Sequence, residues 1–320
     1  MRQIHNANNY FFSCDWGTTS FRLSLVDSNT RNVIYQHDTS GGVKNLFGRW
    51  SRDPGHPDRE TFFLNYLEDQ IRQVADQVSP TLKNIPVLIS GMASSSIGIV
   101  ELPYARVPFS LADASVSSRL IPRSDHNTRD ILLISGVRSS SDVMRGEEVQ
   151  LLGLAAGFSL ENAVAVMPGT HSKHVFIRQQ QVTDFKTYMT GEVFELLSSR
   201  SVLSDSVSSG DILHTDAFLE GVKKGCEENL LHALFEVRTR DLLAGVEPAP
   251  NFDFLSGLII GSEVGDLLSI SPGDLYIIGS DPLNTRYKTA LEYLDFNPET
   301  VPNPGDLIIQ GHLKIINRNT

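Results

Sequence analysis

Apolar and polar residues alternate over three short segments near the start of the chain. The segments YFFSCDW, FRLSLVD and NVIYQHD are rich in β-branched, aromatic and leucine residues and are separated by polar turns, which predicts three strands. A Gly-, Pro- and Arg-rich stretch over 40–57 then predicts a loop, and apolar residues at helical spacing predict a helix over 58–77. The rest of this half is predicted, in chain order, as a strand over 87–92, an irregular stretch over 95–130, a strand over 131–137 and a helix over 141–157.

The second half of the chain repeats this scheme. The segments NAVAVMPGTHSK, HVFIRQ and VTDFKTYMT predict strand, turn, strand, turn and strand, followed by a helix over 191–199. The later elements are predicted as helical stretches over 213–243 and 253–270, a strand over 275–280, and helices over 283–294 and 305–320. Strands and helices arranged alike in two halves predict an α/β protein of two domains, 1–157 and 158–320.

The turn of the first predicted hairpin carries the sequence DWGTT, beginning at Asp15. Gly17 permits close approach of the backbone to a ligand, and Thr18, Thr19 and the turn amides can donate hydrogen bonds to phosphate oxygens. Asp15 ends a strand that is predicted to be buried, where its carboxylate can hold Mg²⁺ through water. An ordinary β-hairpin with polar turn residues explains the pattern equally well.

A similar turn, PGTHSK over 168–173, follows the first strand of the second half. Its candidate ligand-binding residues are Gly169, Thr170, His171, Ser172 and Lys173. Strand–glycine turns are common, so either turn alone is weak support for a ligand site. Two of them at matching places in two similar halves predict that they face each other across a cleft and bind one triphosphate. The G-x-x-x-x-G-K-[ST] and G-x-G-x-x-G signatures of other nucleotide sites are missing from the sequence.

Composition and charge argue against several classes of function. Of the 320 residues, 40% are hydrophobic and 20% are charged, as in a globular protein with a core. The 27 basic and 38 acidic residues give a net charge of −11, which disfavours nucleic acid and anionic lipid as partners. Cys14 and Cys226 form no zinc motif or disulfide framework. The sequence also has neither a secretory signal nor an apolar span of about 18 residues, so we expect a cytoplasmic protein.

A series of motifs resembles one kinase family. In chain order the motifs are DWGTTSFR (15–22), ISGMASSSIGIVELPY (89–104), DVMRGEEVQLLG (142–153), MPGTHSKHV (167–175), TYMTGEVFELL (187–197), FLSGLIIGSEVG (254–265) and LYIIGS (275–280). Together they are similar to the 2-dehydro-3-deoxygalactonokinases of the actin/hexokinase/Hsp70 ATPase superfamily. The resemblance implies two ribonuclease-H-like domains with an active-site cleft between them. It also implies phosphorylation of the C6 hydroxyl of 2-dehydro-3-deoxy-D-galactonate, with ATP and Mg²⁺.

An alcohol kinase needs a carboxylate that orients the hydroxyl and accepts its proton. The segment DVMRGEE, which precedes and opens a helix, is similar in position to the segment that carries this base in related carbohydrate kinases. By that match we predict Glu147 as the base, with Glu148 and Asp142 as alternatives. A purely structural role is also open, because acids in a first helical turn interact favourably with the helix dipole.

A sugar-acid substrate carries a carboxylate, which arginine binds best through two parallel hydrogen bonds. Arg145 is adjacent to the predicted base and is our first candidate; the alternatives are Arg22, Arg106 and Arg138. The candidate sugar-pocket residues are Ser90, Gly91, Met92, Glu101 and Tyr104. A packed loop is the alternative interpretation of this segment.

Gly279 follows a predicted strand in a turn that resembles the adenosine-side turn of the family, so we expect the nucleotide near it. An ordinary strand-to-helix turn is the alternative. Gly257, Gly261 and Gly265 recur every four residues, which predicts close packing of another helix or close approach of a ligand.

The expected partners are the sugar acid and ATP, with no nucleic acid and no membrane, and a homodimer is the candidate assembly. Two other functions stay open from the sequence. One is a kinase of the same fold that acts on another sugar or sugar acid. The other is a non-catalytic sensor of sugar or nucleotide on the same scaffold.

Overall fold

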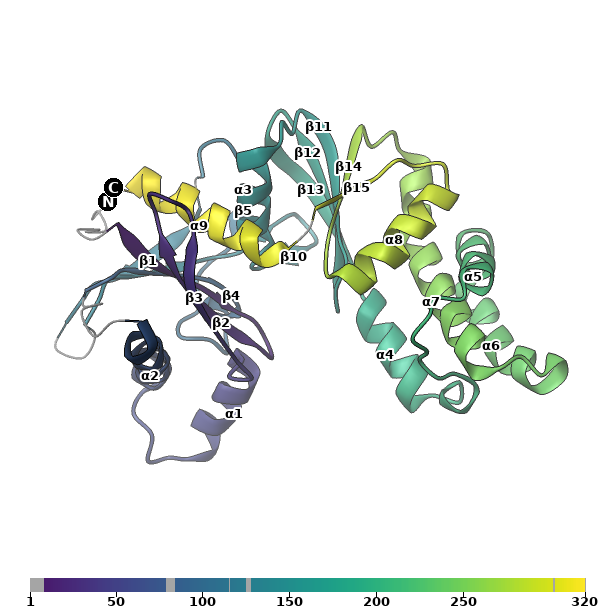
Figure 1. Ribbon diagram of the computed structural model, residues 1–320, viewed down its shortest axis with the longest axis horizontal. Coiled ribbons are helices and arrows are strands. Elements are labelled where there is room, and N and C mark those ends of the chain that lie inside the picture. Colours follow the sequence, from purple (N-terminus) through teal and green to yellow (C-terminus); the bar gives the residue numbers. More distant parts are fainter. Residues whose placement is uncertain (1–8, 79–83, 115, 125–127, 302, 320) are drawn as a thin grey trace. The chain divides into compact units, whose positions relative to one another are not determined.

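The chain folds into two compact units. The computed structural model describes residues 9–78, 84–114, 116–124, 128–301 and 303–319. Unit 1 contains the chain up to Ser159, Gln180–Thr183 and the segment from Gly305 onwards, whereas unit 2 contains Leu160–Gln179 and Asp184–Pro304. This division differs from the predicted domains 1–157 and 158–320, since the C-terminal helix groups with unit 1 (Figure 1).

Unit 1 is built on a mixed sheet. Its strands are β1 (Tyr10–Trp16), β2 (Phe21–Asp27), β3 (Val33–Thr39), β4 (Val87–Gly91), β7 (Ser118–Ile121) and β8 (Ile131–Ile134), in the spatial order β3-β2-β1-β4-β8-β7. Strands β1, β2 and β3 pair antiparallel, and β4 pairs parallel with both β1 and β8. The predicted three-stranded meander is therefore confirmed, and the parallel strand β4 ends beside it.

Helices pack against the sheet of unit 1. They are α1 (Val43–Arg52), α2 (Arg59–Val78), α3 (Glu147–Gly157) and α9 (Pro304–Asn319), accompanied by the short elements η1 (Met92–Ser94), β5 (Ala105–Arg106), β6 (Phe109–Ser110), β9 (Val137–Arg138) and β10 (Val143–Met144). Phe12, Cys14 and Trp16 of β1 enter the same buried cluster as apolar residues of α2. Ser13 points the other way, and its hydroxyl is 2.7 Å from Nδ1 of His312 on α9. α2 and α9 thus cover opposite faces of the sheet (Figure 1).

α9 also touches α3 backbone to backbone. A Cβ added at Gly153 would stand 1.9 Å from the carbonyl oxygen of Leu307, and one added at Gly311 would stand 2.1 Å from that of Val149. Only glycine fits at both positions. This close crossing explains why the C-terminal segment belongs to unit 1, and it fixes α3 to α9, the helix that contacts β1.

Unit 2 contains a second sheet of the same design. Its strands are β11 (Asn162–Met167), β12 (Ser172–Arg178), β13 (Gln181–Tyr188), β14 (Asp274–Ile278) and β15 (Glu299–Val301), in the order β15-β14-β11-β12-β13. The sheet ends at β6, which pairs with Gln181 and Val182, in the part of β13 that groups with unit 1. β11 pairs antiparallel with β12 and parallel with β14, which pairs parallel with β15. In both units, then, a meander is extended past its first strand by parallel strands, as in a ribonuclease-H-like fold.

The helices of unit 2 include a very close pair. They are α4 (Thr190–Arg200), α5 (Thr215–Glu227), α6 (Leu230–Ala244), α7 (Pro248–Val264) and α8 (Asp281–Tyr293), with short turns η2 (Ser204–Ser206) and η3 (Gly265–Ser269). A Cβ added at Gly257 of α7 would stand 2.0 Å from the carbonyl oxygen of Phe218 on α5, and one added at Gly261 would stand 2.3 Å from that of Val222. The recurring glycines are therefore a helix-packing feature, one of the two interpretations that the sequence allowed.

Two predicted elements are wrong. The segment 40–57 contains helix α1 rather than a loop, and the helix predicted over 141–157 begins only at Glu147. The helical stretches predicted over 213–243 are confirmed as α5 and α6, with a break at Glu228 and Asn229. In the second case the chain first forms the short strand β10 and then turns at Gly146, whose φ of 109° is left-handed. At the break between α5 and α6, the Asn229 side chain accepts hydrogen bonds from two backbone amides and begins a new helix.

Candidate active site

The turn between β1 and β2 is fixed by backbone contacts. The amide of Gly17 donates to the carbonyl of Ser20 at 2.9 Å, and the carbonyls of Gly17 and Thr18 each accept a 3.0 Å hydrogen bond from the first two amides of α1. A Cβ added at Gly42 would stand 2.4 Å from Cα of Thr19, so α1 lies directly against the turn. Because the side chains of Thr18 and Thr19 stay exposed, the turn keeps hydroxyl donors available for a ligand.

Asp15 lies at the end of β1, between neighbours on two adjacent strands. Nη1 of Arg22 on β2 is 3.3 Å from its Oδ2, and Ser90 of β4 stands opposite it in the parallel register. Burial raises the pKa of Asp15 above its usual value, the adjacent Arg22 lowers it, and the negative charge of Glu147 raises it again. The Ser90 hydroxyl is buried and forms no hydrogen bond with the residues that the structure describes. A carboxylate whose charge is incompletely compensated, next to an unused hydroxyl, fits a water-bridged Mg²⁺ ion.

Two glycines bring α3 to this carboxylate. Gly91 at the end of β4 and Gly146 before α3 have left-handed φ values of 88° and 109°, and a Cβ added at Gly146 would stand 3.4 Å from Cα of Gly91. Glu147 is the first residue of α3, and its charge acts on Asp15. Unit 1 therefore brings together three sequence-predicted site residues, Asp15, Gly91 and Glu147.

The three candidate bases lie in different surroundings. Glu147 is half-buried, and its Oε2 accepts a 2.9 Å hydrogen bond from the amide of Arg145. Glu148 is fully buried; its Oε2 accepts from the amide of Gly146 at 2.7 Å. Oδ1 of Asp142 accepts from the next amide in the chain at 2.8 Å, in the connection between β9 and β10. Of the three, Glu147 combines partial exposure with an electrostatic effect on Asp15.

Glu148 should make stability depend on pH. Burial, assisted by the charge of Glu147, raises the pKa of Glu148 from 4.5 to about 8. Between these values the unfolded chain has released the proton while the folded chain keeps it, so the free energy of unfolding decreases as pH rises through this window and levels off above it. We expect Glu148→Gln to remove this slope and to be more stable than wild type at pH 9, by on the order of a few kcal/mol.

Urea unfolding midpoints at pH 5, 7 and 9 measure this effect. Glu161→Gln is the matched control, because Glu161 is exposed and its replacement should leave the pH slope unchanged. Parallel pH curves for wild type and Glu148→Gln would contradict the buried, protonated state of Glu148.

Arg145, the first candidate for binding the substrate carboxylate, is held in place by contacts with Ser94 and Tyr104. Its Nη1 donates to the carbonyl oxygen of Ser94 at 2.6 Å and to the hydroxyl of Ser94 at 2.5 Å. Its guanidinium lies 4.2 Å from the ring centroid of Tyr104, a cation–π contact that orients the planar group. Met92 is half-buried in η1, and Glu101 is exposed on the following segment. The structure thus joins Arg145 and Tyr104, whereas Arg22 pairs with Asp15 and Arg106 is exposed.

The second predicted turn, in unit 2, is supported by the start of α4. A Cβ added at Gly191 would stand 2.4 Å from the carbonyl oxygen of Gly169 and 2.8 Å from Cα of Thr170. The amide of Glu192 donates to the carbonyl of Thr170 at 3.0 Å, and its side chain lies 2.6 Å from Nε2 of His171. A Cβ at Gly169 itself would meet no protein atom within 4 Å, so open space lies above this residue.

A buried carboxylate ties this turn to the helices around it. Glu263 of α7, which is 3% exposed, accepts hydrogen bonds from Ser172 (2.6 Å), Tyr287 (2.6 Å) and Thr190, and it lies 3.0 Å from Nε2 of His174. The Ser172 hydroxyl, predicted as a ligand donor, is therefore engaged within the protein. Lys173 is 5% exposed, and its Nζ donates to the carbonyl of His171 at 3.2 Å.

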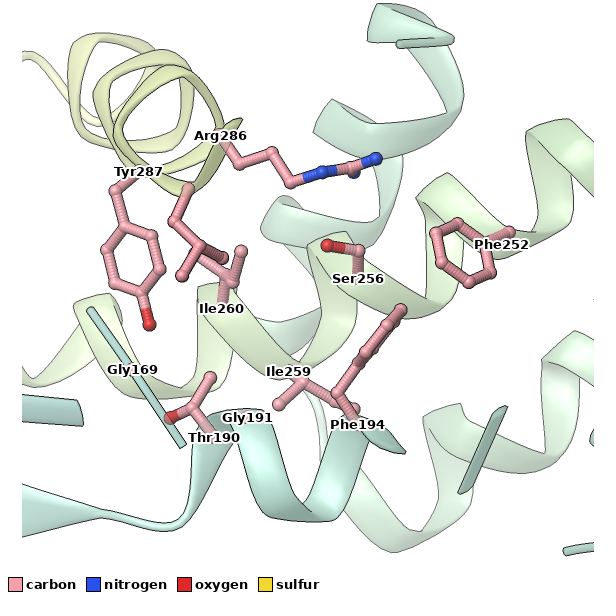
Figure 2. A pocket seen from close by; sticks show the side chains of 11 residues that line it. Gly169, Thr190, Gly191, Phe194, Phe252, Ser256, Ile259, Ile260, Arg286 and Tyr287 are labelled. Atoms are coloured by element: carbon pink, nitrogen blue, oxygen red, sulfur yellow. The ribbon is translucent and has the colours of Figure 1, made fainter. Parts of the chain in front are cut away.

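Next to the turn, unit 2 contains a mainly apolar cavity of about 180 Å³. It is lined by Gly169, Thr190, Gly191, Phe194, Phe252, Ser256, Ile259, Ile260, Leu283, Arg286 and Tyr287. Figure 2 shows the rings of Phe194 and Phe252 and the guanidinium of Arg286 around Ser256. Nη2 of Arg286 donates to Asp253 at 2.6 Å, while its buried Nη1 has no partner among the described residues.

Gly279 joins the same region. A Cβ added there would stand 2.7 Å from Oδ1 of Asn284 and 3.3 Å from Cδ of Pro168, the residue before Gly169. The two predicted glycine turns of unit 2 therefore lie side by side. Sequence reasoning missed Glu263 and the aromatic and arginine residues of the cavity, because each lies on a helix whose partners are set by tertiary packing.

Comparison with known proteins identifies the relatives of this chain. Residues 15–315 match the family model described as 2-keto-3-deoxy-galactonokinase. The chain is 34% identical over 302 residues to the Rhizobium meliloti (strain 1021) protein named "Probable 2-dehydro-3-deoxygalactonokinase DgoK1", covering 91% of this chain and 92% of that one. It is 29% identical over 313 residues to the 2-dehydro-3-deoxygalactonokinase of Escherichia coli (strain K12), covering 96% and 97%.

A solved structure agrees with these matches. The crystal structure of a candidate 2-dehydro-3-deoxygalactonokinase protein from Sinorhizobium meliloti is similar with a TM-score of 0.83 and 32% sequence identity, over 97% of this chain and 98% of that one. The family resemblance seen in the sequence is confirmed. So is the predicted fold class, an α/β protein of two ribonuclease-H-like domains.

Proposed function

The chain belongs to the 2-keto-3-deoxy-galactonokinase family, and on that basis we propose that it transfers the γ-phosphoryl group of ATP to the C6 hydroxyl of 2-dehydro-3-deoxy-D-galactonate. The observation that carries this proposal is the placement of Glu147 within electrostatic reach of Asp15 at the end of β1. An alcohol kinase needs one carboxylate for the hydroxyl and another for the metal, and these two residues supply the pair.

Glu147 is the proposed base. It orients the C6 hydroxyl and accepts its proton as the oxygen bonds to the γ-phosphorus and ADP leaves. Asp15 is the proposed Mg²⁺ residue. No group of three or more His, Cys, Asp and Glu that could hold a metal occurs among the described residues, which suits Mg²⁺, because that ion binds through one or two carboxylates, waters and substrate phosphates. When bound, Mg²⁺ neutralises developing phosphate charge.

Unit 2 is the proposed nucleotide-binding unit. Gly169 and Thr170 offer an open turn for the phosphates, with Lys173 beside it and Ser172 positioning it through Glu263. We assign the purine to the adjoining apolar cavity, where aromatic side chains can contact a ring. Gly279, which lies against Pro168 beside this turn, is the proposed contact to the ribose.

The sugar acid is assigned to unit 1. Arg145 binds its carboxylate, because contacts with Ser94 and Tyr104 already orient the guanidinium. The proposed lining of the sugar pocket is Ser90, Gly91 and Met92. Glu101 and Tyr104 are the proposed contacts to the sugar hydroxyls. Because the whole chain carries a net negative charge, an anionic substrate needs a local positive charge in its pocket. Arg145 is the proposed source of that charge.

Small molecules rather than nucleic acid or lipid are the proposed partners, in a cytoplasmic setting. Throughout the described ranges, helices long and apolar enough to cross a membrane are absent.

A coupled assay for ADP formation tests the proposed function. With ATP and Mg²⁺, we expect kcat/KM for 2-dehydro-3-deoxy-D-galactonate to exceed that for 2-dehydro-3-deoxygluconate, galactonate and free hexoses by about tenfold or more, since unpaired polar groups penalise the wrong hydroxyl pattern. A higher kcat/KM for another sugar would identify a different kinase of the same fold. Tight binding of the sugar acid without ADP release would instead favour a sensor and overturn the proposal.

A further inference from the structure

Arg286 is the charged residue of the cavity in unit 2. Among the described residues that line this cavity, no other carries a charge. The side chain is only 20% exposed, and its Nη1 is buried without a hydrogen-bond partner in the described part of the chain. A buried N–H that finds no acceptor costs free energy, because its hydration is lost without replacement. The fold alone gives no reason for this donor, whereas a ligand in the cavity would use it.

The guanidinium of Arg286 is already fixed in orientation. Its Nη2 donates to Oδ1 of Asp253 at 2.6 Å. Asp253 is 2% exposed, and its Oδ2 accepts from the backbone amide of His214 at 2.8 Å and lies 2.9 Å from Nδ1 of the same residue. The Cζ atom of Arg286 lies 5.7 Å from the ring centroid of Phe218 and 6.0 Å from that of Phe252. Because these contacts hold the planar group before any ligand arrives, binding loses little side-chain entropy.

The surroundings of Nη1 favour a neutral acceptor. Asp253 already compensates the charge of Arg286 at 2.6 Å, so a phosphate or carboxylate in this mainly apolar cavity would be desolvated without a cation of its own. Arginine carries only donors, so the ligand atom must be an acceptor. The rings of Phe194 and Phe252 line the cavity (Figure 2) and suit a flat ring. Together these features describe an aromatic ring with a neutral acceptor on its edge.

Ser256 is a second polar group available to such a ring. Two other polar side chains of the cavity, Thr190 and Tyr287, donate their hydroxyls to Glu263. Ser256 lies beside the guanidinium of Arg286 (Figure 2), and a hydroxyl can donate or accept. Purines offer a matching edge. N7 is an acceptor in both adenine and guanine, and the neighbouring group at position 6 is a donor in adenine and an acceptor in guanine.

We propose that Arg286 donates from Nη1 to N7 of the purine of the phosphoryl donor, while Ser256 contacts the group at position 6. This inference rests on the proposed function, in which the phosphates lie at the Gly169 turn and the purine enters the cavity beside it. The Arg286 donor suits either purine, and the Ser256 hydroxyl turns to suit either group at position 6. The protein therefore selects a purine nucleoside triphosphate rather than ATP alone, with kcat/KM for GTP within about tenfold of that for ATP.

Kinetics of Arg286→Met test this contact, because methionine keeps an apolar side chain in the cavity and removes the donor. We expect KM for ATP to rise by about tenfold or more, with kcat and the KM for the sugar acid nearly unchanged, since the lost hydrogen bond is to the base and not to the transferred phosphoryl group. Arg240→Met is the matched control. The Arg240 side chain is 19% exposed, pairs with Glu220 at 2.7 Å and lies 4.1 Å from the ring centroid of Phe254, but it does not line the cavity. This control should keep the wild-type KM for ATP.

The analogue 7-deaza-ATP, in which carbon replaces N7, identifies the purine atom. Its KM should exceed that of ATP by about tenfold in the wild type, and the two values should be equal in Arg286→Met, since the partner of N7 is then missing. A raised KM for 1-deaza-ATP instead of 7-deaza-ATP, together with rejection of GTP, would overturn the assignment of N7. A wild-type KM for ATP in Arg286→Met, or an equal rise in Arg240→Met, would overturn the role of Arg286.

Calorimetric titration with ATP separates this inference from the proposed function, because binding needs no turnover, and circular dichroism verifies that each variant is folded. A wild type that releases no ADP, yet binds ATP more tightly than Arg286→Met does, would refute the kinase and support the base contact. ADP formation by wild type and Arg286→Met with equal affinity for ATP would support the kinase and refute the base contact.

Discussion

Replacing Asp15 by asparagine should lower turnover by about 10²–10³-fold, the loss typical of removing one transition-state charge contact, while leaving the protein folded and at least as stable. The two effects separate because burial raises the pKa of Asp15, which means that the fold disfavours the charged carboxylate there. The ion pair with Arg22 offsets little of the free-energy cost of burying this charge, because the arginine side chain is 51% exposed. A carboxylate placed where burial disfavours its charge is best explained by its use on a bound ion.

Kinetics across a Mg²⁺ titration, with urea midpoints alongside, measure both effects. Asp38→Asn is the matched control, because Asp38 is a carboxylate on the neighbouring strand β3, in register with Arg22. It should turn over at nearly the wild-type rate. Near-normal kcat for Asp15→Asn at saturating Mg²⁺ would remove Asp15 from the metal-binding role, and a large loss of stability would show that it is structural.

The meanders are predictable from sequence because their pattern is local. β1 and β2 cover the residues predicted for them, 10–16 and 21–27, since alternation and turn residues define both ends. α1 is different. Gly42, Gly48 and the prolines beyond it suggest a loop, and the helix is stabilised by the carbonyls of Gly17 and Thr18, which accept its first amides. That support comes from a turn more than twenty residues earlier in the chain and has no local signal.

The residues of the candidate site also fall into two groups, those that the sequence predicts and those that it does not. Asp15, Gly91 and Glu147 are predictable because each stands at the end of a strand or the start of a helix, and the strand order brings those ends together. Glu263 is not predictable. It is one acid in a long apolar helix, and its role depends on donors from β12, α4 and α8 that only the folded unit assembles. The binding of one triphosphate by both glycine turns stays a prediction.

Glu147→Gln is expected to lower kcat by about 10²–10⁴-fold with little change in the KM for either substrate, the range for loss of a general base. Glutamine keeps the shape of the side chain and an oxygen that can accept the amide of Arg145, as Oε2 does at 2.9 Å in the wild type. It cannot take the hydroxyl proton. The loss should therefore fall on the chemical step.

Two neighbouring acids provide controls that test the assignment itself. Glu148 has a pKa of about 8 and is mostly protonated at pH 7, so Glu148→Gln replaces one neutral side chain by another and should keep turnover near wild type. Asp142→Asn should also stay active, because Asp142 lies in the connection between β9 and β10 rather than at the start of α3. If Asp142→Asn or Glu148→Gln abolishes phosphorylation while Glu147→Gln retains it, the base lies at that other position. In that case the charge of Glu147 serves only to raise the pKa of its neighbours Asp15 and Glu148.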